Sequence, residues 1–80
     1  MTTPLLATTL VRADHVRSFY VRQAGQAGWE AAQFEDQRIV QQLRCSDWHR
    51  VELTLFRFAR EIAELRALGW REAGPSGSES

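Results

Sequence analysis

Residues 46–70, SDWHRVELTLFRFAREIAELRALGW, constrain the fold more than any other stretch of this chain. Five apolar residues recur there at spacings of four, three, four and three, which places them on one stripe of an α-helix. No glycine or proline interrupts residues 46–68, and Leu, Arg, Glu and Ala dominate, all of which are good helix formers. The sequence therefore predicts one long amphipathic helix. Its apolar stripe consists of Val51, Leu55, Phe58, Ile62 and Leu65.

Both ends of this helix carry capping signals. Ser46 or Asp47 can accept a hydrogen bond from an unpaired backbone N–H of the first turn. Gly69 can end the helix because glycine enters the left-handed conformation without strain.

Two segments that precede the helix have β character. Leu5 to Arg12 (LLATTLVR) is apolar and β-branched, which favours a strand, with a short helix as the alternative. Val16 to Gln23 (VRSFYVRQ) clusters Val, Phe and Tyr and is the clearest strand of the chain. Residues 13–15 would form the turn between them. Residues 24–28 (AGQAG) form a loop, since two glycines interrupt any regular pattern.

Residues 29–44, WEAAQFEDQRIVQQLR, support two interpretations. Propensity favours a helix. The pattern favours a β-hairpin with a polar turn at residues 35–37, although the turn lacks the Asn-Gly or Asp-Gly pair of tight hairpins. In a helix, Asp36 would fall on the apolar stripe, where an unpaired carboxylate is costly. We predict the hairpin. Its second strand would place Ile39, Leu43 and Cys45 on the inner face and Arg38, Gln42 and Arg44 on the outer face.

These elements predict an α+β fold, in which an antiparallel meander of three to four strands is followed by one long C-terminal helix packed on the sheet. A three-helix all-α fold, with residues 29–44 helical, is the alternative. The single domain would span residues 5–70, and we expect residues 1–4 and the polar tail at residues 71–80 to be disordered. The helix would pack on Phe19, Val21, Ile39 and Leu43, with Trp48 closing one end of the core.

The segment VRSFYV and the ending Gly69-Trp70 resemble the WGR domain, a small module whose strands precede a helix that ends in glycine and an aromatic residue. The resemblance is one of shape and covers only these two segments. The Trp-Gly-Arg triplet that names the family is missing, and Phe34-Glu35-Asp36 stand near its place. The chain is therefore not assigned to that family.

Composition limits the class of protein. Eighty residues allow one small domain, whose core is marginal unless a second copy of the chain or another contribution stabilises it. Ten basic and ten acidic residues cancel, so no strong field attracts nucleic acid or a membrane. Cys45 is the only cysteine, which excludes an intrachain disulfide and favours a reducing compartment. The start of the chain has no basic region typical of a signal peptide and no membrane-spanning run, so we expect a cytoplasmic protein.

A second face of the long helix is a candidate contact surface. Leu53 and Phe56 lie one turn apart on this face, roughly opposite the core stripe. A symmetric helix–helix contact between two copies would bury them and would add to the small core. Scattered exposed apolar residues are the alternative explanation. The residues predicted for self-association, as a homodimer or with a partner protein, are Leu53, Phe56, Arg60 and Ala63.

The outer sheet face is the second candidate surface. Aromatic rings among arginines are typical of proteins that bind single-stranded nucleic acid, where bases stack and guanidinium groups hold phosphates. Trp29 or Phe34 would lie among them, depending on the register. The zero net charge and the neighbouring Glu30 and Glu35 favour an ordinary solvated face instead. The residues predicted for the possible nucleic-acid surface are Tyr20, Arg22, Arg38 and Arg44.

The sequence indicates no catalytic, metal or cofactor site. Asp47, His49 and Glu52 fall within one turn, but Asp47 is already a candidate cap and two ligands do not make a zinc site. Cys45 is expected to be a small buried hydrophobe. We therefore expect a non-enzymatic binding or adaptor module, whose target the sequence does not identify.

Overall fold

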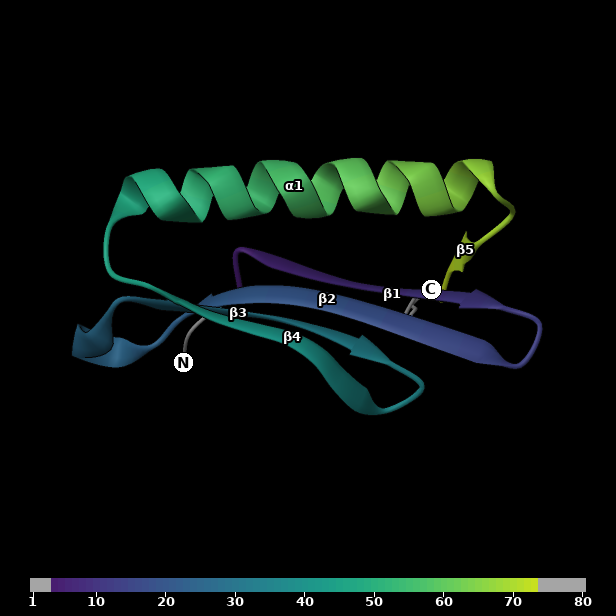
Figure 1. The fold of residues 1–80 in the computed structure, drawn as a ribbon, viewed down its shortest axis with the longest axis horizontal. Coiled ribbons are helices and arrows are strands. Elements are labelled where there is room, and N and C mark those ends of the chain that lie inside the picture. Colours follow the sequence, from purple (N-terminus) through teal and green to yellow (C-terminus); the bar gives the residue numbers. More distant parts are fainter. Residues whose placement is uncertain (1–3, 74–80) are drawn as a thin grey trace, which may run out of the picture.

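The computed structural model describes residues 4–73, which form one antiparallel sheet and one helix (Figure 1). Strands β1 to β4 form a meander, and the long helix α1 lies across one face of it (Figure 1). The predicted α+β architecture is confirmed, and residues 29–45 form the hairpin rather than a helix. The elements are β1 (Leu6–Arg12), β2 (His15–Gln23), a short 3-10 helix (Gly25–Ala27), β3 (Trp29–Glu35), β4 (Arg38–Cys45), α1 (Trp48–Ala67) and β5 (Arg71–Glu72).

The described part of the sheet has five strands in the order β4-β3-β2-β1-β5. The last strand corrects our assignment of residues 71–80 to a disordered tail. Arg71 and Glu72 pair with Val11 and Leu10 of β1, and the backbone N–H of Ala73 donates to the carbonyl of Thr9 at 2.8 Å. The chain end therefore returns to the sheet beside β1. The rest of the predicted disorder, at residues 1–3 and 74–80, lies outside the described residues.

Both predicted caps of α1 are present. Asp47 is the N-cap, and its Oδ1 accepts a hydrogen bond from the backbone N–H of Arg50 at 2.9 Å. At the other end Gly69 has φ +104°, and the N–H of Trp70 donates to the carbonyl of Leu65 at 3.0 Å. This Schellman geometry reverses the chain and places Trp70 against the core.

The core lies between α1 and the inner face of the sheet. Leu10, Phe19 and Val21 contribute from β1 and β2, and all three are almost fully buried. From the helix, Phe58 meets Phe19 edge-to-face with ring centroids 5.4 Å apart. The predicted stripe is thus the core-facing side of α1: Val51, Phe58 and Leu65 are buried, and Leu55 and Ile62 are half-buried against them.

A β-bulge in β4 overturns part of the predicted register. Gln41 pairs with Gln33, but the next pair is Ile39 with Phe34, so Val40 is an extra residue. A slip of one residue exchanges the two faces of a strand. Ile39 therefore lies on the outer face and is 56% exposed rather than packed under the helix. Arg38, predicted on the outer face, pairs with Glu35 on the helix side of the sheet.

Trp48 is a second correction to the predicted core. Its side chain is 48% exposed and packs edge-on against Trp29, with ring centroids 5.7 Å apart. Trp48 is the first residue of α1, so it covers the rim of the core instead of filling it.

The close approach at Gly28 generates a testable prediction. Gly28 has φ +101°, and a Cβ there would collide with the backbone carbonyl of Cys45. Gly28→Ala should lower the free energy of unfolding by more than about 2 kcal/mol, because strain and a backbone clash add together. Gly25→Ala is the matched control, since Gly25 also has a positive φ but no atom within 4 Å. Equal shifts of the two midpoints in guanidinium unfolding would contradict the clash.

Candidate functional site

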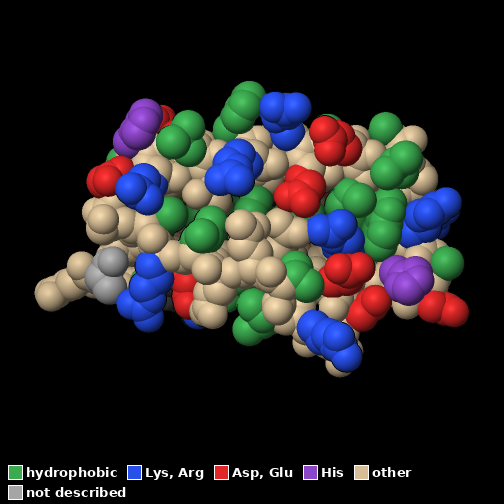
Figure 2. All heavy atoms as spheres, in the orientation of Figure 1, with side chains coloured by type: hydrophobic (Ala, Val, Ile, Leu, Met, Phe, Trp, Pro, Cys, Tyr) green, Lys and Arg blue, Asp and Glu red, His purple; other side chains and the backbone are tan. Residues whose placement is uncertain are grey.

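The outer face of α1 presents the four residues that we predicted for self-association. Phe56 is 63% exposed and Leu53 is 51% exposed, and Arg60 and Ala63 are exposed beside them. In Figure 2, hydrophobic side chains alternate with basic and acidic ones along the helix at the top of the view, and no patch of one sign forms. We call Leu53, Phe56, Arg60 and Ala63 the outer helix face.

The sheet face opposite α1 is covered by none of the described elements (Figure 1). Its centre holds Tyr20 and Phe34, whose rings stack with centroids 5.9 Å apart and an interplanar angle of 27°. The register thus selects Phe34, and not Trp29, as the second aromatic of this face. Ala32, which pairs with Tyr20 and lies on the same strand as Phe34, is 1% exposed, so neighbouring side chains cover it. We call this surface the open sheet face. Its outward residues include Ala7, Thr9, Ser18, Tyr20, Arg22, Glu30, Ala32, Phe34, Gln42 and Arg44.

A hydrogen-bonded cluster occupies one end of the open sheet face. Arg22 Nη2 and Nε donate to Glu30 Oε1 at 3.0 and 3.2 Å, and Gln42 Nε2 donates to Glu30 Oε2 at 3.1 Å. The bonds from Arg22 and Gln42 hold the pKa of the Glu30 carboxyl below its usual value. The guanidinium of Arg22 also lies 5.4 Å from the centroid of the Tyr20 ring. Arg44 pairs with Glu30 across β3 and β4 and is exposed.

The structure brings together three of the four residues predicted for nucleic acid. Tyr20, Arg22 and Arg44 lie on the open sheet face around Glu30. Arg38 does not join them, because it lies six residues from Arg44 along β4, about 20 Å in an extended strand. The bulge also turns it to the other side of the sheet.

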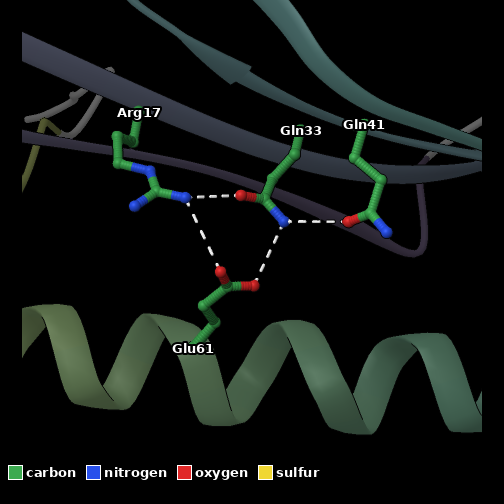
Figure 3. Close-up of polar contacts among 4 residues, drawn as sticks. All are labelled: Arg17, Gln33, Gln41 and Glu61. Atoms are coloured by element: carbon green, nitrogen blue, oxygen red, sulfur yellow. Dashed lines mark hydrogen bonds and ion pairs between the residues drawn. The ribbon is translucent and has the colours of Figure 1, made fainter.

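A polar network joins the sheet to the helix (Figure 3). We did not predict it from the sequence. Gln33 is 4% exposed, and its Nε2 donates to Glu61 Oε1 at 3.1 Å and to Gln41 Oε1 at 3.2 Å. Arg17 Nη2 donates to Gln33 Oε1 and lies 3.6 Å from Glu61 Oε2. The four side chains point toward one another from β2, β3, β4 and α1 (Figure 3). Residues two apart in a strand lie on the same face, so an inward-facing Ala31 could have predicted that the Gln33 amide faces inward as well.

A second unpredicted contact links two turns of the meander. Asp36, in the turn between β3 and β4, accepts from the backbone N–H of Val16 at 2.8 Å and lies 3.0 Å from Nδ1 of His15. The hydrogen bond to Asp36 raises the pKa of the His15 imidazole. The same bond, with that from Val16, lowers the pKa of the Asp36 carboxyl. The strength of the contact between His15 and Asp36 therefore depends on the protonation of these two side chains.

Metal-binding and nucleophilic side chains were the remaining candidates among residues 4–73. No three His, Cys, Asp or Glu side chains of this part of the chain lie close enough to hold a metal ion. Cys45 is 3% exposed, and its Sγ lies 3.8 Å from Thr54 Oγ1 inside the core. Within these residues no helix is long and apolar enough to cross a membrane.

The chain was compared with protein-family models, with curated proteins and with solved structures, and none of these comparisons gives a match.

The contact between His15 and Asp36 predicts a pH dependence. Because the folded state raises the pKa of His15, its stabilising contribution is complete below about pH 6.5 and is lost as the pH rises through the raised value. The midpoint of urea unfolding should therefore fall as the pH is raised above about 6.5. His15→Gln should remove this decrease, and His49→Gln, the control, should keep it. A decrease that persists in His15→Gln would assign the dependence to other groups.

The polar network predicts a cost for losing its central amide. Gln33→Leu should lower the free energy of unfolding by about 1–3 kcal/mol, because Arg17 and Gln41 lose a buried partner. Gln23→Leu, at an exposed position near the end of β2, is the control and should change little. Equal unfolding midpoints for the two variants would show that the network adds no stability.

Proposed function

We propose that this chain is a small cytoplasmic, non-enzymatic binding module that self-associates through the outer helix face. The observation that carries the proposal is the pair Leu53 and Phe56, two large apolar side chains more than half exposed on the same side of α1. A few well-buried side chains carry most of the free energy of a protein interface. A contact between two copies would also add apolar burial that a chain of this length needs.

The charges beside Phe56 support a two-fold contact between antiparallel helices. Glu52 precedes Phe56 by one turn and Arg60 follows it by one turn. A two-fold axis through Phe56 would stack the two Phe56 rings and set Arg60 of each copy opposite Glu52 of the other. Such an isologous arrangement is complementary to itself in both shape and charge.

The sheet edges are poor alternatives for self-association. The free edge of β4 carries the bulge at Val40 and two arginines, Arg38 and Arg44, which are features that natural proteins use to block edge pairing. The other outer strand, β1, is partly covered by β5. Helix-mediated contact is therefore the route that the surface favours.

The non-enzymatic and cytoplasmic parts of the proposal rest on Cys45. It is the one thiol of the chain, and its burial beside Thr54 supports a packing role rather than a nucleophilic one. A free thiol also fits a reducing compartment.

Self-association is tested by the solution mass from light scattering during size exclusion at two protein concentrations. We expect a mass of twice 9.2 kDa that decreases on dilution. Phe56→Glu should give the monomer mass and a lower unfolding midpoint, because the two carboxylates would face each other across the axis. Leu68→Glu, at an equally exposed residue beyond the end of α1, is the control and should remain a dimer. A monomeric wild-type chain at both concentrations would reject the proposal.

A further inference from the structure

The open sheet face combines aromatic rings with arginines. Tyr20 and Phe34 form a nearly parallel aromatic pair at its centre, and the neighbouring positions on β1 and β2 hold small side chains, Ala7, Thr9 and Ser18. Phe34 packs against Tyr20 from one side along β2, and the Arg22 guanidinium lies over the Tyr20 ring from the other, 5.4 Å from its centroid. A stacking base would therefore displace the Arg22 guanidinium from Tyr20 or stack on Phe34. Nucleic-acid bases stack on aromatic rings irrespective of their identity, since every base has a π-face.

The shape of the face agrees with this use. An open hollow of about 460 Å³ is lined by Pro4, Ala7, Tyr20, Arg22 and Gln23. A second open hollow, of about 430 Å³, extends along β1 and shares Ala7 and Tyr20 with the first. Glu72 lines this second hollow, so the first, which Arg22 lines, is the one that suits an anionic ligand.

The charge presented by this face is positive although the chain as a whole is neutral. Glu30 is the acidic residue at the centre of the cluster, and its side chain is only 14% exposed beneath Arg22 and Gln42. Arg22 is 58% exposed, so the bonds to Glu30 orient the guanidinium while part of it still faces solvent. Arg44 is exposed next to Glu30 and has no ion-pair partner among the described residues. The face thus carries one oriented cation, Arg22, and one exposed cation, Arg44.

We propose that the open sheet face binds single-stranded nucleic acid, with bases stacked on Tyr20 and Phe34 and phosphates held by Arg22 and Arg44. Single strands fit better than a duplex, because a flat face offers no element that could enter a groove and because duplex bases are already stacked on each other. The apolar part of the face continues from Phe34 to its neighbour Ile39, which is 56% exposed, so binding of a protein partner is the alternative outcome of the test. The site lies on the side of the sheet opposite α1, so binding does not depend on self-association through the outer helix face (Figure 1).

The test is fluorescence anisotropy with labelled oligothymidine of about twelve nucleotides, titrated with the full chain. We expect saturable binding at about 50 mM salt, and a slope of log affinity against log salt near −1.4, about −0.7 for each of two phosphate contacts. Arg44→Gln should weaken binding and reduce the slope by about 0.7. Tyr20→Leu should weaken binding by about tenfold without changing the slope, because it removes stacking and no charge.

Matched controls separate the face from unspecific attraction. Arg57→Gln removes an exposed arginine of α1 and should leave affinity and slope as in the wild type. Circular dichroism of each variant verifies folding, and Phe34→Leu is the second stacking variant if Tyr20→Leu unfolds. An absent signal at about 50 mM salt, equal affinity for a duplex of the same length, or equal losses in Arg57→Gln and Arg44→Gln would each overturn the proposal. The proposal would also be overturned if the chain bound no nucleic acid and a protein partner slowed hydrogen exchange of the amides on the open sheet face.

Discussion

The packing of a single helix against one face of the sheet is the constraint on which the rest of this structure depends. Phe58 and Phe19 meet edge-to-face at its centre, and Val51, Leu10 and Val21 are fully buried around them. Neither layer is stable alone, since the strands and the helix each have one apolar side that must leave water. The capped ends of α1 then set its length, and the Schellman turn at Gly69 delivers β5 to the edge of β1.

The polar network joins the helix to the strands beside the apolar core. Gln33 on β3 and Arg17 on β2 reach across to Glu61 on α1, and hydrogen bonds and an ion pair replace apolar contact there. Because hydrogen bonds are directional, they also orient α1 relative to the strands, which purely apolar contacts would do less well.

The open sheet face is a consequence of having one helix. An antiparallel sheet can pack one face on the core and leave the other solvated. Here the exposed side is not merely polar. The Tyr20 and Phe34 rings shelter Ala32, and Glu30 is enclosed by Arg22 and Gln42. Side chains therefore organise this face without a covering layer, and they leave cations and aromatic rings at the surface.

The sequence by itself determined the local elements and their order. Periodicity identified α1 and its core stripe, capping chemistry identified Asp47 and Gly69, and alternation identified the hairpin of β3 and β4. These features depend on residues near one another in the chain, so spacing is sufficient to predict them. The exposure of Leu53 and Phe56 followed from the same periodicity.

Only the tertiary structure decided the features that depend on pairing between distant segments. The bulge at Val40 exchanged the faces of Ile39 and Arg38, because one extra residue reverses strand alternation. Arg71, Glu72 and Ala73 bond to the edge of β1, a pairing between distant segments that their own short and mostly polar sequence does not indicate. The contact of His15 with Asp36 and the network around Gln33 join strands and turns whose register no local pattern specifies. Local chemistry thus fixed what each segment becomes, and pairing in three dimensions decided which side chains meet.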